Sequence, residues 1–230
     1  PAQRDALETI RKSGGHLLAL IDDLLDLARH AHLDKLFIGF ESVNPESLDA
    51  MRKKQTVSDL VRAVRVLRRH RIHIHGMFVL GFDEDDWKTV KKTLRFAKKA
   101  RLATTQFLIL TPLPGTALYH QIEAEDRFRF RDWALFDAHH VVFEPARFSL
   151  PDLQKAQIFC HRKFYSLKQT VRKLMAGEWL SVGIAHYARR LNRTWQRRNK
   201  TYLRVVELLR PRPGGATISI DYRENVSLEK

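Results

Sequence analysis

Short apolar runs alternate with amphipathic segments between residues 36 and 119. The apolar runs predict buried parallel strands at Leu36–Phe40, Ile74–Leu80 and Gln106–Leu110. Between them, apolar residues recur at helical spacing, as in Leu60–Leu67 and Trp87–Ala97. The strands follow one another at intervals of roughly 30–38 residues, long enough for right-handed helical crossovers. The pattern therefore predicts an α/β fold.

Helix-start signals lie after the first predicted strand and on both sides of the second. Asn44 before Pro45 is typical of an N-cap and first helical position. Ser58 is predicted to cap the helix before the second strand, and Asp85 or Asp86 the helix after it.

Helical patterns also occupy both flanks of this region. Apolar residues recur at helical spacing in residues 3–30, and strand signals stop after Tyr119. Further helices are predicted at about Leu150–Ala176 and Glu178–Leu209, before a Pro/Gly cluster. The sequence thus predicts an N-terminal helix (1–32), an α/β region (33–125), a helical C-terminal extension (126–210) and a loose tail (211–230).

Each predicted strand ends in a polar or glycine-bearing segment. In α/β proteins the carboxyl ends of strands are where ligands sit, so three consecutive ends are expected to face one site. Glu41 and Ser42 suit hydrogen bonds to a hydroxylated ligand such as a ribose, and Gly81 allows close backbone approach. The alternative is ordinary loop chemistry without a ligand.

The charge of the chain favours an acidic partner. The net charge is +15 and the pI about 10.2. Aromatic and basic residues interleave in 178–212, which suits an interfacial helix on an anionic membrane or phosphate contacts on nucleic acid. The alternative is helix packing by the aromatic residues beneath a solvated basic face.

Cysteine and histidine usage narrows the chemistry. The chain has one cysteine, Cys160, which excludes an internal disulfide, fits a reducing compartment and is expected to pack as a small hydrophobe. His73 and His75 share one face of a strand, but no third metal ligand is placed by the sequence. His139 and His140 are candidates for substrate contact.

The expected location follows from the same composition. There is no apolar run of about 18 residues, so no membrane span is predicted. We expect a cytoplasmic protein with peripheral contact at the inner membrane surface through residues 178–212. The chain begins with Pro1 rather than Met, which suggests a fragment or a processed piece.

Four motifs in order carry a family resemblance. They are LFIGFESVNPESL at 36–48, MRKKQT at 51–56, GMFVLGFD at 76–83 and LTPLPGTALY at 110–119. They resemble the later half of a radical S-adenosylmethionine (SAM) barrel, most of all in the subfamily with an upstream cobalamin-binding domain, which includes hopanoid- and tetrapyrrole-modifying enzymes. Residues 132–145 and the helices after them resemble the C-terminal extension of that subfamily.

The resemblance covers about residues 33–209 and implies a partial (β/α) radical SAM-type barrel with a helical extension. It implies that Glu41 and Ser42 meet the ribose and amino-acid part of SAM. It identifies no catalytic residue in this chain. The implied substrate is a small molecule, lipid-like or otherwise hydrophobic, which favours membrane contact over nucleic acid. The residues implied to pack on the adenine and line the same pocket are Val79, Leu80, Gly81, Leu110, Thr111 and Pro112.

The sequence departs from this family at the iron–sulfur site. The family holds a four-iron four-sulfur cluster with three thiolates of a C-x-x-x-C-x-x-C loop, whereas this chain has only Cys160. The second-strand glycine-rich motif and the cobalamin domain are missing too. SAM, the cluster and cobalamin therefore belong to the parent family, and the chain alone is expected to be inactive.

The N-terminal helix carries a second resemblance. Residues 7–28 resemble the second helix of the sensor histidine kinase dimerisation domain. In that family the phosphoacceptor histidine lies on the preceding helix, so His16 is not a predicted phosphorylation site. The alternative is that they form the barrel helix before the first strand. Two further functions stay open: a histidine kinase dimerisation fragment, and a basic module that binds membrane or nucleic acid.

Overall fold

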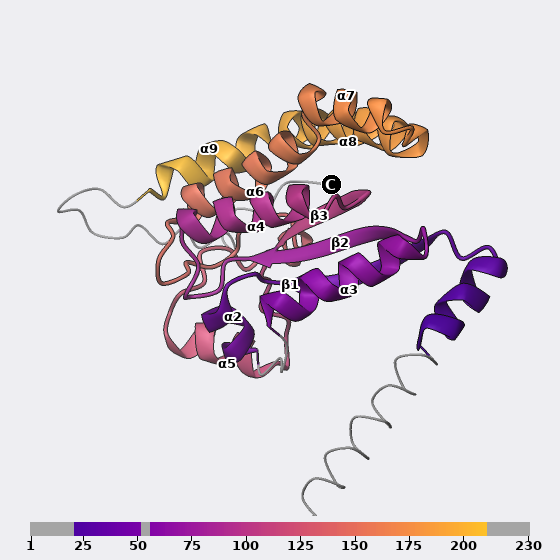
Figure 1. The fold of residues 1–230 in the computed structure, drawn as a ribbon. Coiled ribbons are helices and arrows are strands. Elements are labelled where there is room, and N and C mark those ends of the chain that lie inside the picture. The colour runs from indigo at the N-terminus through magenta and orange to yellow at the C-terminus, as the bar shows by residue number, and fades with distance from the viewer. Residues whose placement is uncertain (1–20, 52–55, 211–230) are drawn as a thin grey trace, which may run out of the picture.

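A three-stranded parallel sheet forms the centre of the fold. The computed structural model describes residues 21–51 and 56–210 (Figure 1). The strands β1 (Lys35–Glu41), β2 (His73–Leu80) and β3 (Thr104–Ile109) pair in that order. The predicted α/β class and its three strands are confirmed, with ends shifted by up to two residues. Glu41 ends β1 instead of opening the loop after it.

Three helices connect the strands: α2 (Pro45–Ala50), α3 (Val57–Arg69) and α4 (Trp87–Lys99). The predicted cap at Ser58 is wrong. Thr56 caps α3 in a reciprocal capping box, accepting from Asp59 N at 3.2 Å while the Asp59 carboxylate accepts from Thr56 N at 2.9 Å. The box needs an acidic or amide side chain three residues after the cap, and Ser58 has a valine there.

A column of aromatic rings fills the core. Phe78 of β2 stacks on Phe40 of β1 and Phe107 of β3, with ring centroids 5.4 and 5.6 Å apart. Phe96 of α4 meets the first two rings edge-on. The opposite face of the sheet is partly open, since Phe37 is 65% exposed. The buried face of the sheet is therefore the one on which α3 and α4 pack.

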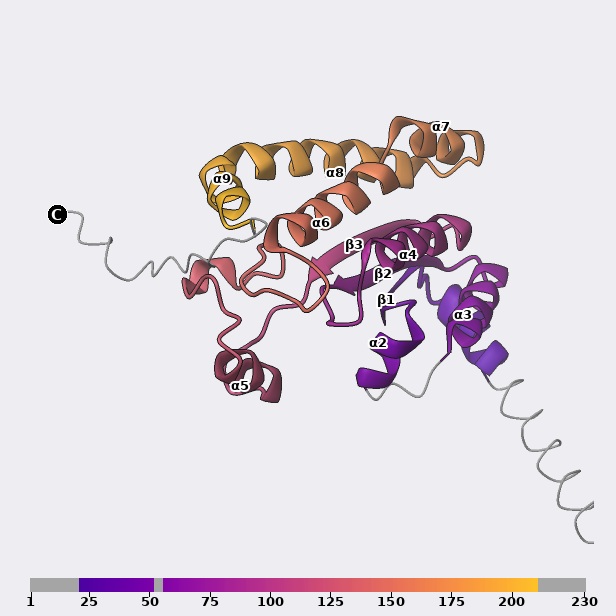
Figure 2. The same ribbon diagram turned by 90° about the vertical axis from the view of Figure 1, so that its left-hand side faces the viewer.

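The C-terminal extension packs on the same core. Its helix α6 lies between the sheet and α8, and α7 and α9 lie at the two ends of α8 (Figures 1 and 2). The two long helices predicted here are each broken, at Tyr165–Ser166 and at Asn199, where serine and asparagine favour helix ends. The elements are α5 (Ala117–Ala124), a 3₁₀ turn (Trp133–Leu135), α6 (Leu150–Phe164), α7 (Leu167–Met175), α8 (Trp179–Arg198) and α9 (Lys200–Leu208).

The outer edge of β3 is covered by side chains of the extension. A sheet cut from a barrel is expected to leave both edge strands open, and for β3 that expectation is wrong. The Tyr165 hydroxyl donates to Thr105 O at 2.7 Å and accepts from Thr105 N at 2.9 Å. Gln157 Nε2 donates to Phe107 O at 3.2 Å, and Ile109 N donates to Ala138 O at 2.8 Å. Two polar side chains and one backbone carbonyl thus bond the outer edge of β3.

Removing the Tyr165 hydroxyl from the outer edge of β3 is expected to destabilise the protein. Tyr165→Phe removes both partners of the buried Thr105 backbone, so the free energy of unfolding is expected to fall by about 2–4 kcal/mol. Urea denaturation measures it, and Tyr187→Phe, at an exposed tyrosine, is the control. Equal stability of the two variants would show that water satisfies the edge.

The N-terminal helix is described only from residue 21. Residues 21–30 are helical, and Asp22 and Asp26 lie 3.2 and 2.7 Å from the two ring nitrogens of His70, which follows α3. The hydrogen bond to Asp26 raises the pKa of His70. Most of the predicted kinase-like helix, including His16, and the tail 211–230 lie outside the described residues. Within the described ranges, no helix is both long enough and apolar enough to cross a bilayer.

Candidate functional site

The segments predicted to bind SAM lie next to one another at the carboxyl ends of the strands. β3 is extended by a hydrogen bond from Leu110 N to Leu80 O at 2.9 Å, which places 79–81 beside 110–112. Across β2, Glu41 pairs with Phe78 after a register shift. The carboxyl ends of the three strands are therefore neighbours, as the pattern of strands and loops predicts.

Part of this set lies on the open face of the sheet. Val79 and Leu110 are partly exposed. Glu41 has a left-handed backbone, with φ of 59°. Its carboxylate folds back over Gly39. A Cβ at position 39 would overlap Glu41 Oε1, so only glycine leaves room for this arrangement. Gly39 therefore leaves room for an acidic group at the rim of the open face.

Other predicted residues point into the protein. Ser42 is 2% exposed, and its hydroxyl accepts from Asn44 N at 3.0 Å. Leu80 and Pro112 are also buried, and the hydroxyl of Thr111, which is partly exposed, donates to Ile109 O at 3.1 Å. The hydroxyls of Ser42 and Thr111 thus bond the local backbone, and Leu80 and Pro112 pack into the protein.

Gly81 is needed for packing by α6. Its φ is 107°, a conformation that favours glycine. A Cβ there would lie 2.8 Å from Leu153 Cδ2 of α6. The C-terminal extension therefore approaches this glycine closely on the side where a Cβ would stand.

Asp85 is the site residue that sequence reasoning missed. It is 1% exposed, and its carboxylate accepts from Gly81 N at 3.0 Å, Phe82 N at 3.2 Å and Ser47 Oγ at 3.1 Å. Burial raises its pKa to about 6 despite these bonds. Asp86, next to it, caps α4 through Thr89 N. Asp85 therefore ties the loop after β2 to the helix that follows β1.

Asp83 ties the same loop to the C-terminal extension. Its carboxylate forms an ion pair with Arg127 and accepts from Ala146 N at 2.9 Å. Hydrogen bonds from Arg127 and Ala146 hold the pKa of Asp83 below its usual value, against the effect of burial. Arg147 donates to Glu84 O at 3.2 Å. The loop is therefore held from both sides.

A hollow of about 380 Å³ lies farther along the open face, towards the amino ends of the strands. Phe37, His75 and Gln106 line its sheet side, and His161 and Trp195 line its helical side. The rings of Phe37 and His75 lie 4.7 Å apart. Burial lowers the pKa of His161 to about 4, so its imidazole is neutral at pH 7. The hollow is aromatic and largely uncharged.

The two adjacent histidines of the extension have different surroundings. His139 lines the hollow. His140 is buried, with Nδ1 2.9 Å from the Asp137 carboxylate and Nε2 3.1 Å from Asn199 Oδ1. Its two nitrogens join the turn before α6 to the start of α9, so the expected substrate contact does not fit His140.

The cluster of the family does not fit these residues. Cys160 is fully buried in α6, as expected for a small hydrophobe, and burial raises its pKa to about 12. Such a thiol is protonated at pH 7 and is the sole cysteine of the sequence. Among the described residues, no three His, Cys, Asp or Glu side chains come together as metal ligands.

The comparison with protein families agrees with the strand-end geometry. Residues 7–97 match the family described as the radical SAM superfamily. This part of the chain is similar to the radical SAM domain. The match begins at residue 7 and so includes the segment that also resembles a histidine kinase helix.

Curated relatives extend the similarity into the C-terminal extension. The bacteriochlorophyllide d C-12(1)-methyltransferase of Chlorobaculum tepidum is 33% identical over 160 residues, 69% of this chain and 34% of that protein. An anaerobic magnesium-protoporphyrin IX monomethyl ester cyclase of Cereibacter sphaeroides is 25% identical over 64% of this chain and 24% of its own length. The hopanoid C-2 methylase of Rhodopseudomonas palustris is 26% identical over 46% and 20%. The chain thus spans about a third or less of these relatives.

Proposed function

We propose that this chain is the nucleoside-binding part of a cobalamin-dependent radical SAM enzyme that modifies a tetrapyrrole or another hydrophobic small molecule. One observation carries the proposal: the carboxyl ends of the three strands, two of them within the family match, are neighbours beside an acidic group on the open face. The names of the relatives support methyl transfer or ring closure on a hydrophobic substrate.

The residues at the edge suit a nucleoside. A carboxylate such as that of Glu41 accepts hydrogen bonds from ribose hydroxyls. Val79 and Leu110 offer an apolar surface to a purine ring. Asp83 and Asp85 hold the loop that follows β2 in place. The role of this chain is then to bind and orient the adenosine portion of SAM.

The chemistry that follows binding is not supplied by these residues. Cys160 is buried and single, so a cluster that cleaves SAM requires thiolates from elsewhere, and we derive no radical step from this chain. The proposal concerns the nucleoside half of the pocket.

Binding of S-adenosylhomocysteine tests the proposal, since this ligand carries the same nucleoside and needs no iron to hold it. Calorimetry on the full chain is expected to show binding without added iron. Glu41→Gln is expected to weaken it about tenfold, the effect of losing a charge-assisted hydrogen bond.

Glu46→Gln is the matched control, because Glu46 is an exposed acid on α2 away from the open face. It is expected to bind as the wild type does. Absence of binding, or equal loss in both variants, would contradict the proposed role of Glu41 and of this edge.

A further inference from the structure

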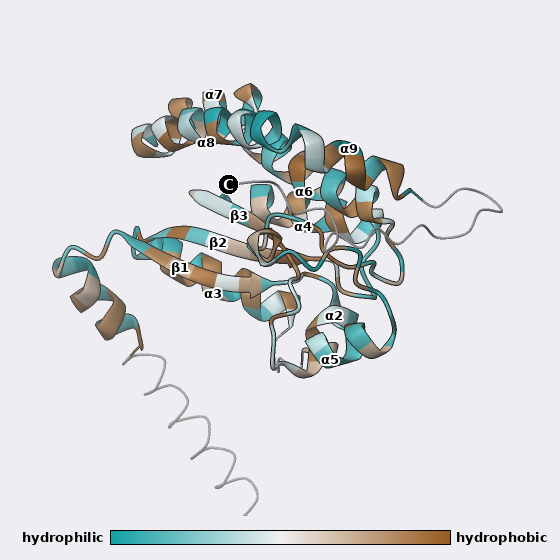
Figure 3. Ribbon diagram, turned by 180° about the vertical axis from the view of Figure 1, so that it is seen from behind, coloured by the Kyte–Doolittle hydropathy of each residue, from teal (hydrophilic) through white to brown (hydrophobic). Residues whose placement is uncertain are grey.

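The α7–α8 corner carries large apolar side chains that the described chain leaves uncovered. No residue of α7 is buried, although the helix is amphipathic. Met175 is 85% exposed and Trp179 71%. In Figure 3 the helices end here in hydrophobic segments, away from the rest of the molecule. We call this surface the apolar corner, and its residues are Leu167, Val171, Leu174, Met175, Trp179 and Leu180.

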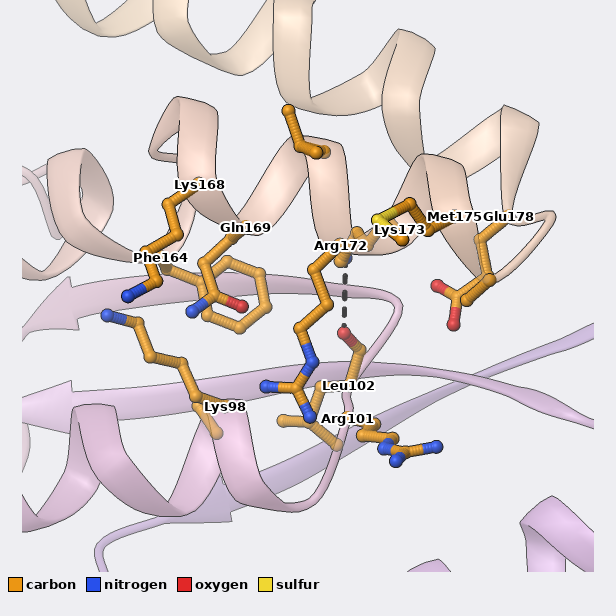
Figure 4. Close-up of a pocket in the computed structure, with 13 residues that line it drawn as sticks. Lys98, Arg101, Leu102, Phe164, Lys168, Gln169, Arg172, Lys173, Met175 and Glu178 are labelled. Atoms are coloured by element: carbon orange, nitrogen blue, oxygen red, sulfur yellow. Dashed lines mark hydrogen bonds between the residues drawn. The ribbon is translucent and has the colours of Figure 1, made fainter.

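Cations gather beside the apolar corner. A hollow of about 480 Å³ lies between α4 and α7, and the only acid among its lining residues is Glu178. Figure 4 shows the amines of Lys98 and Lys168 pointing toward one another and Arg172 extending into the same space. The cations that line it are Lys98, Arg101, Lys168, Arg172 and Lys173.

One of these cations has a structural role. Lys173 donates to Leu102 O at 3.3 Å and also bonds Ala103 O, so it fastens α7 to the start of β3. Burial lowers its pKa to about 8. The others line the same hollow with Glu178 as the only acid in its lining, and a cleft lined by charges of one sign attracts groups of the opposite charge.

We propose that the apolar corner and this cationic hollow dock the protein on an anionic phospholipid bilayer. The apolar corner would enter the boundary between headgroups and acyl chains, with Trp179 at the interface, and the cations would contact lipid phosphates. The surface combines an apolar face with cations on one side, which distinguishes a bilayer from a purely apolar protein partner. It lies near Leu102, at the amino end of β3, away from the strand ends at Leu110.

This assignment shifts the expected membrane contact along the chain. The sequence pattern places it in residues 178–212, where basic residues are densest. The structure instead assigns it to 167–180 and the cations around α4 and α7. Among the described residues, the large apolar side chains with the greatest exposure, Met175, Trp179 and Leu167, lie there beside basic groups. The inference does not depend on the nucleoside site.

Vesicle sedimentation with the full chain tests this docking. Binding is expected to vesicles of phosphatidylcholine with 30% phosphatidylglycerol, and much less to phosphatidylcholine alone. The double variant Met175→Glu/Leu180→Glu is expected to lose at least about tenfold in binding. Leu113→Glu/Leu208→Glu, at two exposed leucines elsewhere, is the matched control and should bind normally.

The charges are tested separately. Lys168→Gln and Arg172→Gln are expected to lower binding about fivefold each, whereas Arg193→Gln and Arg197→Gln on α8 should have less effect. Quenching of tryptophan fluorescence by brominated lipid should fall in Trp179→Phe. Equal loss in the α7 and α8 variants, or no vesicle binding, overturns the proposal. Self-association without lipid that Met175→Glu abolishes also overturns it, because a second copy would then cover the corner.

Discussion

Replacing Phe78 with alanine is expected to lower the free energy of unfolding by about 3–5 kcal/mol, the range for a buried phenylalanine. Phe78 is fully buried at the centre of the sheet. Its ring stacks on Phe40 and Phe107 and meets Phe96 edge-on, at 6.1 Å. Alanine leaves a cavity bounded by three strands and a helix, and paired backbones cannot move in to fill it.

Urea denaturation of the full chain, followed by circular dichroism, measures this loss. Phe78→Leu is the graded control, since it keeps most of the volume and should cost less than the alanine variant. Phe37→Ala is the positional control: it lies on the open face, and its loss should be small. A change below about 1 kcal/mol in Phe78→Ala would mean that the three strands do not share this core.

The strands and the position of their carboxyl ends could be predicted from the sequence pattern. Apolar runs between helical segments give the strands, because burial on a parallel sheet needs continuous apolar residues. The site edge follows from topology, since parallel strands end at the same side. Topology brings the ends of β1, β2 and β3 together, whereas the choice of Val79 and Leu110 as site residues came from the family resemblance.

Contacts between distant segments were beyond the pattern. Tyr165 bonds Thr105 across 60 residues, and Asp83 bonds Ala146 across 63. No local periodicity encodes such pairs, because each depends on how the C-terminal helices settle on the sheet. For the same reason the covered edge of β3 and the packing of Leu153 on Gly81 were not expected.

The role of Asp85 could not be predicted from the sequence. Two adjacent aspartates precede α4, and the sequence leaves open which of them caps it. The structure gives the cap to Asp86 and buries Asp85 among donors from the loop after β2 and from Ser47 of α2. An aspartate within the motif GFDEDD thus organises the edge without facing the open side of the sheet.

Replacing Asp85 with alanine is expected to lower the free energy of unfolding by about 3–5 kcal/mol at pH 7, because three donors lose their acceptor. Binding of S-adenosylhomocysteine should fall with it, since the loop at Gly81 borders the candidate site. Asp49→Asn, at an exposed aspartate of α2, is the control for both measurements.

Asp85→Asn isolates the titration. The pKa of Asp85 is raised from 3.8 to about 6 in the folded protein, so the native state holds this proton more tightly than the unfolded state does. Its contribution to stability is full below pH 3.8 and is lost as the pH rises through 6. The difference corresponds to about 3 kcal/mol.

The wild-type pH profile alone does not reveal this loss, because His161 acts in the opposite direction. Its pKa is lowered from 6.5 to about 4, so its contribution is present above pH 6.5 and is lost as the pH falls through 4. The two trends oppose each other between pH 4 and 6.5. The stability of Asp85→Asn relative to wild type should therefore rise by up to about 3 kcal/mol from pH 4 to pH 7. A constant difference across that range would show that Asp85 keeps an ordinary pKa and that its loop is open to water.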